Sequence, residues 1–115
     1  MNKITFEQFK QIMNYDITKN QHYQEIEVWF FIDDSIEYFS SWLGKMLDKE
    51  KKKEIYWYGL VEDGSQAYEF DSFEEFANAK VFYNKSINEI WVSVSLLSID
   101  ACDVQERLPF YLGLA

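Results

Sequence analysis

The sequence predicts a single α+β domain spanning residues 1–115, with a mainly antiparallel sheet and a central β-hairpin packed against three to four helices. Helical and strand-like hydrophobic patterns alternate along the chain without an internal repeat or a linker. A strong tight-turn pair, Asp63-Gly64, separates two strand-like segments near the middle of the chain. The chain is 48% hydrophobic and 19% aromatic with only 4 Gly and 1 Pro, which excludes a disordered or collagen-like protein and indicates one compact core.

The N-terminal part of the chain predicts a helix followed by a strand. Thr5 opens a capping-box pattern and apolar residues then recur at helical spacing, so we expect a helix over residues 5–15. Residues 26–32 alternate in a β-rich composition, which predicts the first strand. Because Trp29 and Phe31 are also large and apolar, both faces of this strand are expected to be covered, which favours a central position in the sheet.

A second helix is predicted over residues 35–49. Asp34 begins another capping-box pattern, and the apolar residues that follow recur at steps of three or four. Lysines gather at the C-terminal end of this segment, where positive charge is favourable beside the free carbonyl groups of a helix. They are Lys45, Lys49, Lys51, Lys52 and Lys53. We interpret the cluster as a solvated helix end, with a basic patch for an acidic partner as the alternative.

The middle of the chain predicts a β-hairpin and a short helix. Residues 54–62 alternate in an aromatic composition, and residues 67–70 can return as the paired strand after the tight turn. Asp71 opens a third capping-box pattern, so a short helix over residues 71–79 is expected next. Residues 81–83 then have a strand-like composition.

The C-terminal third contains one ambiguous segment. Residues 88–94 fit a strand by β-propensity, but Ser86 opens a capping box and the apolar residues share one helical face, so a helix is favoured. We expect a short strand over residues 96–99. A last helical turn over residues 103–108 is predicted to end at Pro109, and an apolar tail follows it.

Residue types that carry catalysis or bind metals are scarce. His22 is the single histidine and lies in a polar segment without a motif, and Cys102 is the single cysteine, expected to be packed or half-buried. The sequence has no glycine-rich phosphate loop, CxxC or His-x-x-x-His pattern. We therefore expect no enzymatic activity, no metal site and no cofactor. A cytoplasmic location is expected, because one cysteine cannot form an intrachain disulfide and no apolar stretch approaches the ~20 residues of a membrane span.

Adjacent carboxylates are the remaining candidates for acid–base or Mg²⁺ chemistry. The pairs are Asp33-Asp34, Glu62-Asp63 and Glu74-Glu75. Adjacent residues of a strand face opposite ways, and acids at helix starts are expected from capping and the helix dipole, so we interpret these pairs as structural. A small carboxylate-dependent hydrolase or nuclease stays as a disfavoured alternative, because a net charge of −9 opposes a polyanionic substrate.

Charge is the strongest functional signal in the sequence. Twenty acidic against eleven basic residues disfavour nucleic acid or an anionic membrane as the main ligand and favour a basic partner. Residues 54–79 carry seven acids and no lysine or arginine, interleaved with aromatic residues. Such a surface could anchor a basic protein through its aromatic side chains and steer it with its carboxylates, the alternative being core aromatics and solubilising acids. The predicted partner-binding residues are Glu62, Asp63, Glu69, Asp71, Tyr58 and Tyr68.

Two segments resemble a known group of proteins. Residues 68–82 and 85–91, with their helix-capping and aromatic positions, resemble small bacterial immunity proteins of contact-dependent growth inhibition and related polymorphic toxin systems. The resemblance implies a cytoplasmic protein that binds one cognate toxin domain, often a basic nuclease, and blocks it without a catalytic residue of its own. A phage-type inhibitor that mimics nucleic-acid charge to block a host nucleic-acid-binding protein is the alternative.

Overall fold

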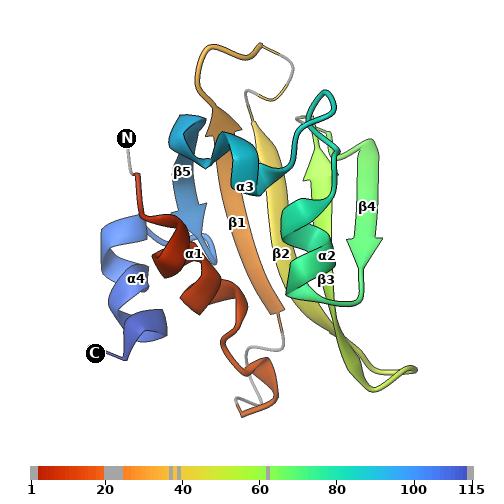
Figure 1. The fold of residues 1–115 in the computed structure, drawn as a ribbon. Helices are drawn as coiled ribbons and strands as arrows, with labels where there is room; N and C mark the ends of the chain where they lie inside the picture. The colour runs from red at the N-terminus through yellow and green to blue at the C-terminus, as the bar shows by residue number, and fades with distance from the viewer. Residues whose placement is uncertain (1–2, 20–24, 37, 39, 62, 114–115) are drawn as a thin grey trace.

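The computed structural model is a five-stranded antiparallel sheet with helices on one face (Figure 1). The structure describes residues 3–19, 25–36, 38, 40–61 and 63–113. The strand order is β4-β3-β2-β1-β5, and each neighbouring pair is antiparallel. The predicted α+β class with a mainly antiparallel sheet is therefore confirmed.

The elements of the described chain are short. The strands are β1 (Glu25–Ile32), β2 (Ser41–Asp48), β3 (Lys53–Leu60), β4 (Gln66–Phe70) and β5 (Val94–Ile99). The helices are α1 (Phe6–Met13), α2 (Phe73–Asn78), α3 (Ile87–Ile90) and α4 (Val104–Leu112), with 3₁₀ turns at Ile17–Lys19 and Trp91–Ser93. Among the described residues, none of these helices has the length and apolar character needed to cross a membrane.

Side-chain caps begin the helices close to where the sequence places them. Thr5 caps α1 and Ser86 caps α3, each in a complete capping box, and Asp103 caps α4. Ser72, not Asp71, caps α2, one residue later than expected. Each cap accepts a backbone N–H that the first helical turn leaves unpaired, which is why these starts can be predicted from sequence.

The predicted helix over residues 35–49 is wrong, because residues 41–48 form β2. In β2, Leu43 and Lys45 point toward the helices, and Trp42 and Met46 point to the other face. Because both faces carry apolar residues, the segment fits a helical period as well as a two-residue period. β2 pairs with β1 on one side and β3 on the other. These two ladders of backbone hydrogen bonds outweigh the local helical propensity.

Lys45 is buried, so the interpretation of the lysine cluster as a helix end is also wrong. The Lys45 ammonium donates to the Tyr15 carbonyl at 2.6 Å, forms an ion pair with Glu54, and lies 5.4 Å from the centre of the Tyr56 ring. This pairing satisfies a charge that would otherwise be costly to bury. The lysines at positions 49, 51 and 52 lie in the turn between β2 and β3.

The remaining elements follow the predictions in part. The predicted hairpin is confirmed as β3–β4, although β4 is an edge strand of the sheet rather than a central one, and β1 lies inside the sheet between β2 and β5. Residues 81–83 are not a strand, since Phe82 makes only an isolated bridge with Lys85. The helix favoured over residues 88–94 is confirmed up to the 3₁₀ turn, and the strand begins at Val94. α4 continues through Pro109 to Leu112 instead of ending there.

Aromatic side chains fill the space between the sheet and its helices. Phe76 of α2 stacks on Tyr58 with ring centres 4.2 Å apart, and Phe9 of α1 stacks on Trp91 at 4.5 Å. The Tyr58 hydroxyl donates to the Phe76 carbonyl at 2.8 Å. Large rings bury the most apolar area per residue and dominate core energetics. The helix-covered face is therefore the core of the domain.

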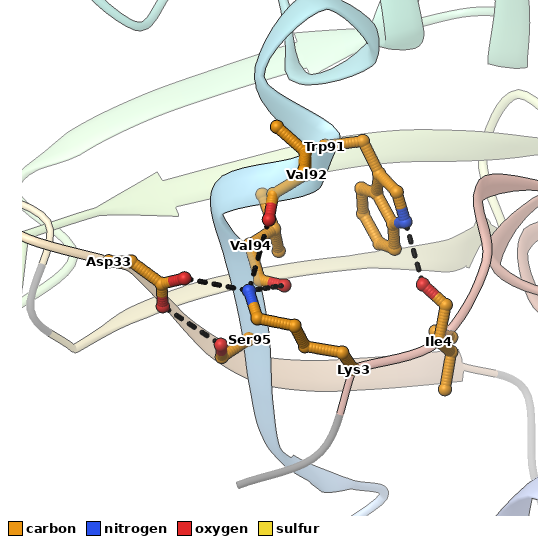
Figure 2. A network of polar contacts seen from close by, with 7 residues as sticks. All are labelled: Lys3, Ile4, Asp33, Trp91, Val92, Val94 and Ser95. Carbon is orange, nitrogen blue, oxygen red and sulfur yellow. Dashed lines mark hydrogen bonds and ion pairs between the residues drawn. The ribbon is translucent and has the colours of Figure 1, made fainter.

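A polar network fastens the N-terminal segment to the start of β5 (Figure 2). The Lys3 ammonium donates to Asp33 at 2.7 Å and to the Val92 carbonyl at 3.1 Å, and the Ser95 hydroxyl donates to the other Asp33 oxygen at 2.9 Å. The Trp91 indole N–H donates to the Ile4 carbonyl at 2.8 Å. These contacts hold the chain end beside the β5 edge of the sheet.

Candidate functional site

The helices cover one face of the sheet (Figure 1). The opposite face carries tryptophans instead of the polar residues usual for an open antiparallel sheet. Strand alternation places these side chains, and the three tryptophans among them are half-buried. We call this surface the tryptophan face. Its members are Glu25, Glu27 and Trp29 of β1, Trp42, Gly44 and Met46 of β2, Ile55, Trp57 and Gly59 of β3, and Ala67 and Glu69 of β4.

The strand register arranges these residues in rows. One row carries an acid at each end and the neighbouring row carries two tryptophans followed by two small residues. The first row is Glu27, Gly44, Trp57 and Glu69, and the second is Trp29, Trp42, Gly59 and Ala67. Directly paired residues have Cβ atoms about 4.5–5.5 Å apart, so neighbours within a row can contact each other.

Gly44 allows the aromatic side chains to lie flat on the sheet. A Cβ atom at Gly44 would overlap the Ile26 carbonyl oxygen and lie 2.8 Å from Cζ2 of Trp57, so the Trp57 indole crosses β2 directly over this glycine. Trp29 and Trp42 stack in the neighbouring row with ring centres 5.3 Å apart and an interplanar angle of 9°. The result is an aromatic floor of three indoles carried by three neighbouring strands.

A groove of about 320 Å³ opens above Gly59. Trp42 and Trp57 flank it, since a Cβ atom at Gly59 would lie 3.8 Å from the Trp42 Cβ and 3.7 Å from the Trp57 Cζ3. Met46 also lines the groove, and Glu69 is the one charged side chain among its described lining residues. We call this hollow the Gly59 groove.

Carboxylates gather at the β1 side of the tryptophan face. Glu25, Glu27 and Asp100 line a hollow of about 260 Å³. Burial first, and then the charges of Glu25 and Asp100, raise the pKa of the Glu27 carboxyl. Asp100 is held in place by Arg107, whose Nε donates to it at 2.9 Å, and by the Tyr111 hydroxyl. A cation near Glu27 would relieve this repulsion.

The predicted partner-binding acids are dispersed. Glu62 lies outside the described residues. Asp63 lies in the β3–β4 turn, where hydrogen bonds from Ser65 lower the pKa of its carboxyl. Glu69 belongs to the tryptophan face. Asp71 pairs with Lys53 at 2.9 Å, which lowers the pKa of the Asp71 carboxyl.

The two tyrosines predicted as anchors are not available together. Tyr58 is only 1% exposed and its hydroxyl is bonded inside the core, so its prediction as a surface anchor is wrong. Tyr68 is 38% exposed, and its register with Tyr58 places it on the helix side of β4, opposite Glu69. Alternation along β4 therefore separates side chains that are adjacent in sequence.

Asp33 of the candidate Asp33-Asp34 pair is engaged in the polar network at the N-terminal segment. Asp33 is held by Lys3 and Ser95, and the hydrogen bond from Lys3 is the main cause that lowers the pKa of the Asp33 carboxyl (Figure 2). Within the described ranges, no group of three or more His, Cys, Asp or Glu residues could hold a metal ion. His22 lies outside these ranges, and Cys102 is exposed rather than packed or half-buried.

A hollow of about 540 Å³ lies on the other side of the sheet between α1 and β3. Its lining includes Lys45 and Glu54, and also Lys53 and Asp71, and these charges pair with one another. The hollow therefore offers a ligand little uncompensated charge from these groups. The tryptophan face combines aromatic area with unpaired acid and is the better candidate.

The predicted partner-binding residues do not include Trp42 or Met46, because the helical interpretation of residues 35–49 conceals their strand register. Trp57 is one of the aromatic residues interleaved with the acids of residues 54–79, but it is not among the predicted partner-binding residues either. No protein-family model, no curated protein and no solved structure matches this chain. The fold and the tryptophan face therefore supply the structural basis for a function.

Proposed function

We propose that this protein is a non-enzymatic immunity protein that binds and neutralises a basic bacterial toxin domain through its tryptophan face. The observation that supports this most is the aromatic floor formed by Trp29, Trp42 and Trp57 on a sheet face that none of the described helices covers. Exposed apolar patches with a polar border mark protein interaction sites, and tryptophan is enriched among the residues that dominate binding energy.

The charge around the aromatic floor selects the kind of partner. Glu25, Glu27 and Glu69 border the floor on two sides, and the whole chain carries a net charge of −9. Acids at the border of an interface steer a basic partner and increase its association rate. The raised pKa of Glu27 also favours a partner that brings positive charge to this face.

The resemblance of residues 68–82 and 85–91 to immunity proteins supports a toxin as the partner. An inhibitor that mimics nucleic acid needs acids spaced along a surface, and a broad tryptophan floor contributes nothing to that mimicry. The aromatic area thus favours a protein–protein interface with the toxin over nucleic-acid mimicry.

Co-expression tests the proposal. The chain is expressed together with the C-terminal domain encoded by the adjacent upstream gene, and cell survival and complex formation are measured. Wild-type protein is expected to restore survival, and Glu69→Lys, on the tryptophan face, is expected to weaken both readouts. Glu106→Lys is the matched control, because Glu106 is an exposed acid on α4 on the other side of the sheet.

Two results would contradict the proposal in different ways. Failure of the wild-type chain to bind or protect would reject the immunity function with this toxin. Equal losses in Glu69→Lys and Glu106→Lys, with both variants folded, would reject the tryptophan face as the interface and leave charge in general as the cause.

A further inference from the structure

We infer that the Gly59 groove binds an arginine side chain of the basic partner, an inference that rests on the proposed function and specifies the chemistry of its interface. The groove provides two indoles, the flexible thioether of Met46, and a floor of small residues at Gly59 and Ala67. With a volume of about 320 Å³ it lies at the small end of ligand pockets and suits one long side chain.

Glu69 supplies the charge for this recognition. Five described carboxylates form ion pairs with bases of the chain itself, namely Asp33, Glu54, Asp71, Glu89 and Asp100. Within the described part of the chain, no ion pair or side-chain hydrogen bond engages Glu69, although it lies directly across from Trp57. A carboxylate paired across the strands with a tryptophan, and with no base among the described residues to neutralise it, can receive a cation from outside.

The shape of the groove favours arginine over lysine. A guanidinium group is planar, weakly hydrated and able to stack on an indole while its N–H groups bond a carboxylate in pairs. A lysine ammonium is a compact, strongly hydrated charge and gains less from stacking on a flat ring. Trp42 and Trp57 contribute indole side chains to the lining of the groove, and Glu69 contributes a carboxylate.

A peptide titration followed by NMR tests the assignment directly. The probes are acetyl-Gly-Arg-Gly-amide and its citrulline analogue, which keeps the shape of arginine but is uncharged. Indole N–H signals of the protein report the site: those of Trp42 and Trp57 are expected to shift with the arginine peptide. The Trp91 signal is the internal reference, because its indole N–H donates to Ile4 on the helix side. We expect binding in the millimolar range and at least about fivefold weaker binding of the citrulline peptide.

Two variants separate the groove from the fold. Gly59→Val fills the groove from its floor and is expected to abolish the Trp42 and Trp57 shifts. Glu69→Gln keeps the size of the side chain and is expected to weaken arginine binding about three- to tenfold without affecting the citrulline peptide. Thermal unfolding of both variants checks that they remain folded, and Gly59→Ala serves as a milder filling variant if valine perturbs the strand.

Equal shifts with the arginine and citrulline peptides, or shifts that persist in folded Gly59→Val, would overturn the arginine assignment. The same variants are then tested in the co-expression assay. Survival conferred by the wild-type chain together with absent peptide binding would reject the groove assignment while leaving the immunity function standing. Peptide binding at the groove without protection by the wild-type chain would reject the immunity function alone.

Discussion

Two strand glycines on the tryptophan face, Gly44 and Gly59, are expected to respond in opposite ways to the same substitution with alanine. Gly44→Ala places a methyl group over the Ile26 carbonyl oxygen and 2.8 Å from Cζ2 of Trp57. Neither neighbour is the free end of a flexible chain: one is backbone of β1, and the other is an indole packed across the sheet. The β1–β2 ladder and the Trp57 ring must both move.

The size of the effect follows from what must move. Overpacking a well-packed site usually lowers the free energy of unfolding by about 1–3 kcal/mol. A clash with backbone is expected to cost at least the upper value of this range, because backbone atoms move less readily than the end of a side chain. We therefore expect Gly44→Ala to lower the free energy of unfolding by about 3 kcal/mol or more. At roughly 4 °C for each kcal/mol in a domain of this size, Tm is expected to fall by more than about 10 °C.

Gly59→Ala is the matched control. A Cβ atom there meets Trp57 at 3.7 Å and Trp42 at 3.8 Å, which are ordinary van der Waals contacts. Because glycine inside a strand costs about 0.5–1 kcal/mol relative to alanine, this variant is expected to be as stable as the wild type or slightly more stable. Urea unfolding followed by circular dichroism measures both variants. Equal stabilities for Gly44→Ala and Gly59→Ala would refute the close approach of Trp57 over Gly44.

The other predictions concern charge. Asp100→Asn removes the carboxylate that holds Arg107 and Tyr111. It is expected to lower the free energy of unfolding by about 2–3 kcal/mol in the same urea assay. An unchanged free energy of unfolding would mean that this network does not stabilise the fold. Glu27→Gln is expected to raise Tm at pH 7. Because folding raises the pKa of Glu27, the charged carboxylate lowers the stability of the wild type at pH values above the ordinary glutamate pKa of 4.5. Below that pH the difference in Tm between the two proteins is expected to vanish. This gain is small, at most ~1 kcal/mol, because the group is largely solvated; a gain that grows on acidification would contradict the reasoning. For the proposed toxin complex, stopped-flow measurements at two ionic strengths are expected to show association slowing markedly between low and physiological salt while dissociation changes less; a flat association rate would mean that the acids contribute only to solubility.

The sequence by itself determined the features that depend on near neighbours. The starts of α1, α3 and α4 follow from Thr5, Ser86 and Asp103, because a cap bonds a backbone N–H only two or three residues away. The β3–β4 hairpin follows from alternation on both sides of a tight turn. The α+β class follows from the mixture of these two kinds of pattern.

Tertiary structure decided what depends on strands that are distant in sequence. Residues 41–48 fit both periods, and pairing with β1 and β3 selected the strand and buried Lys45 against Glu54. The same pairing brought Trp29, Trp42 and Trp57 onto one face. A local pattern specifies how side chains alternate, but the register between strands and the side on which the helices pack determine which alternate set meets water.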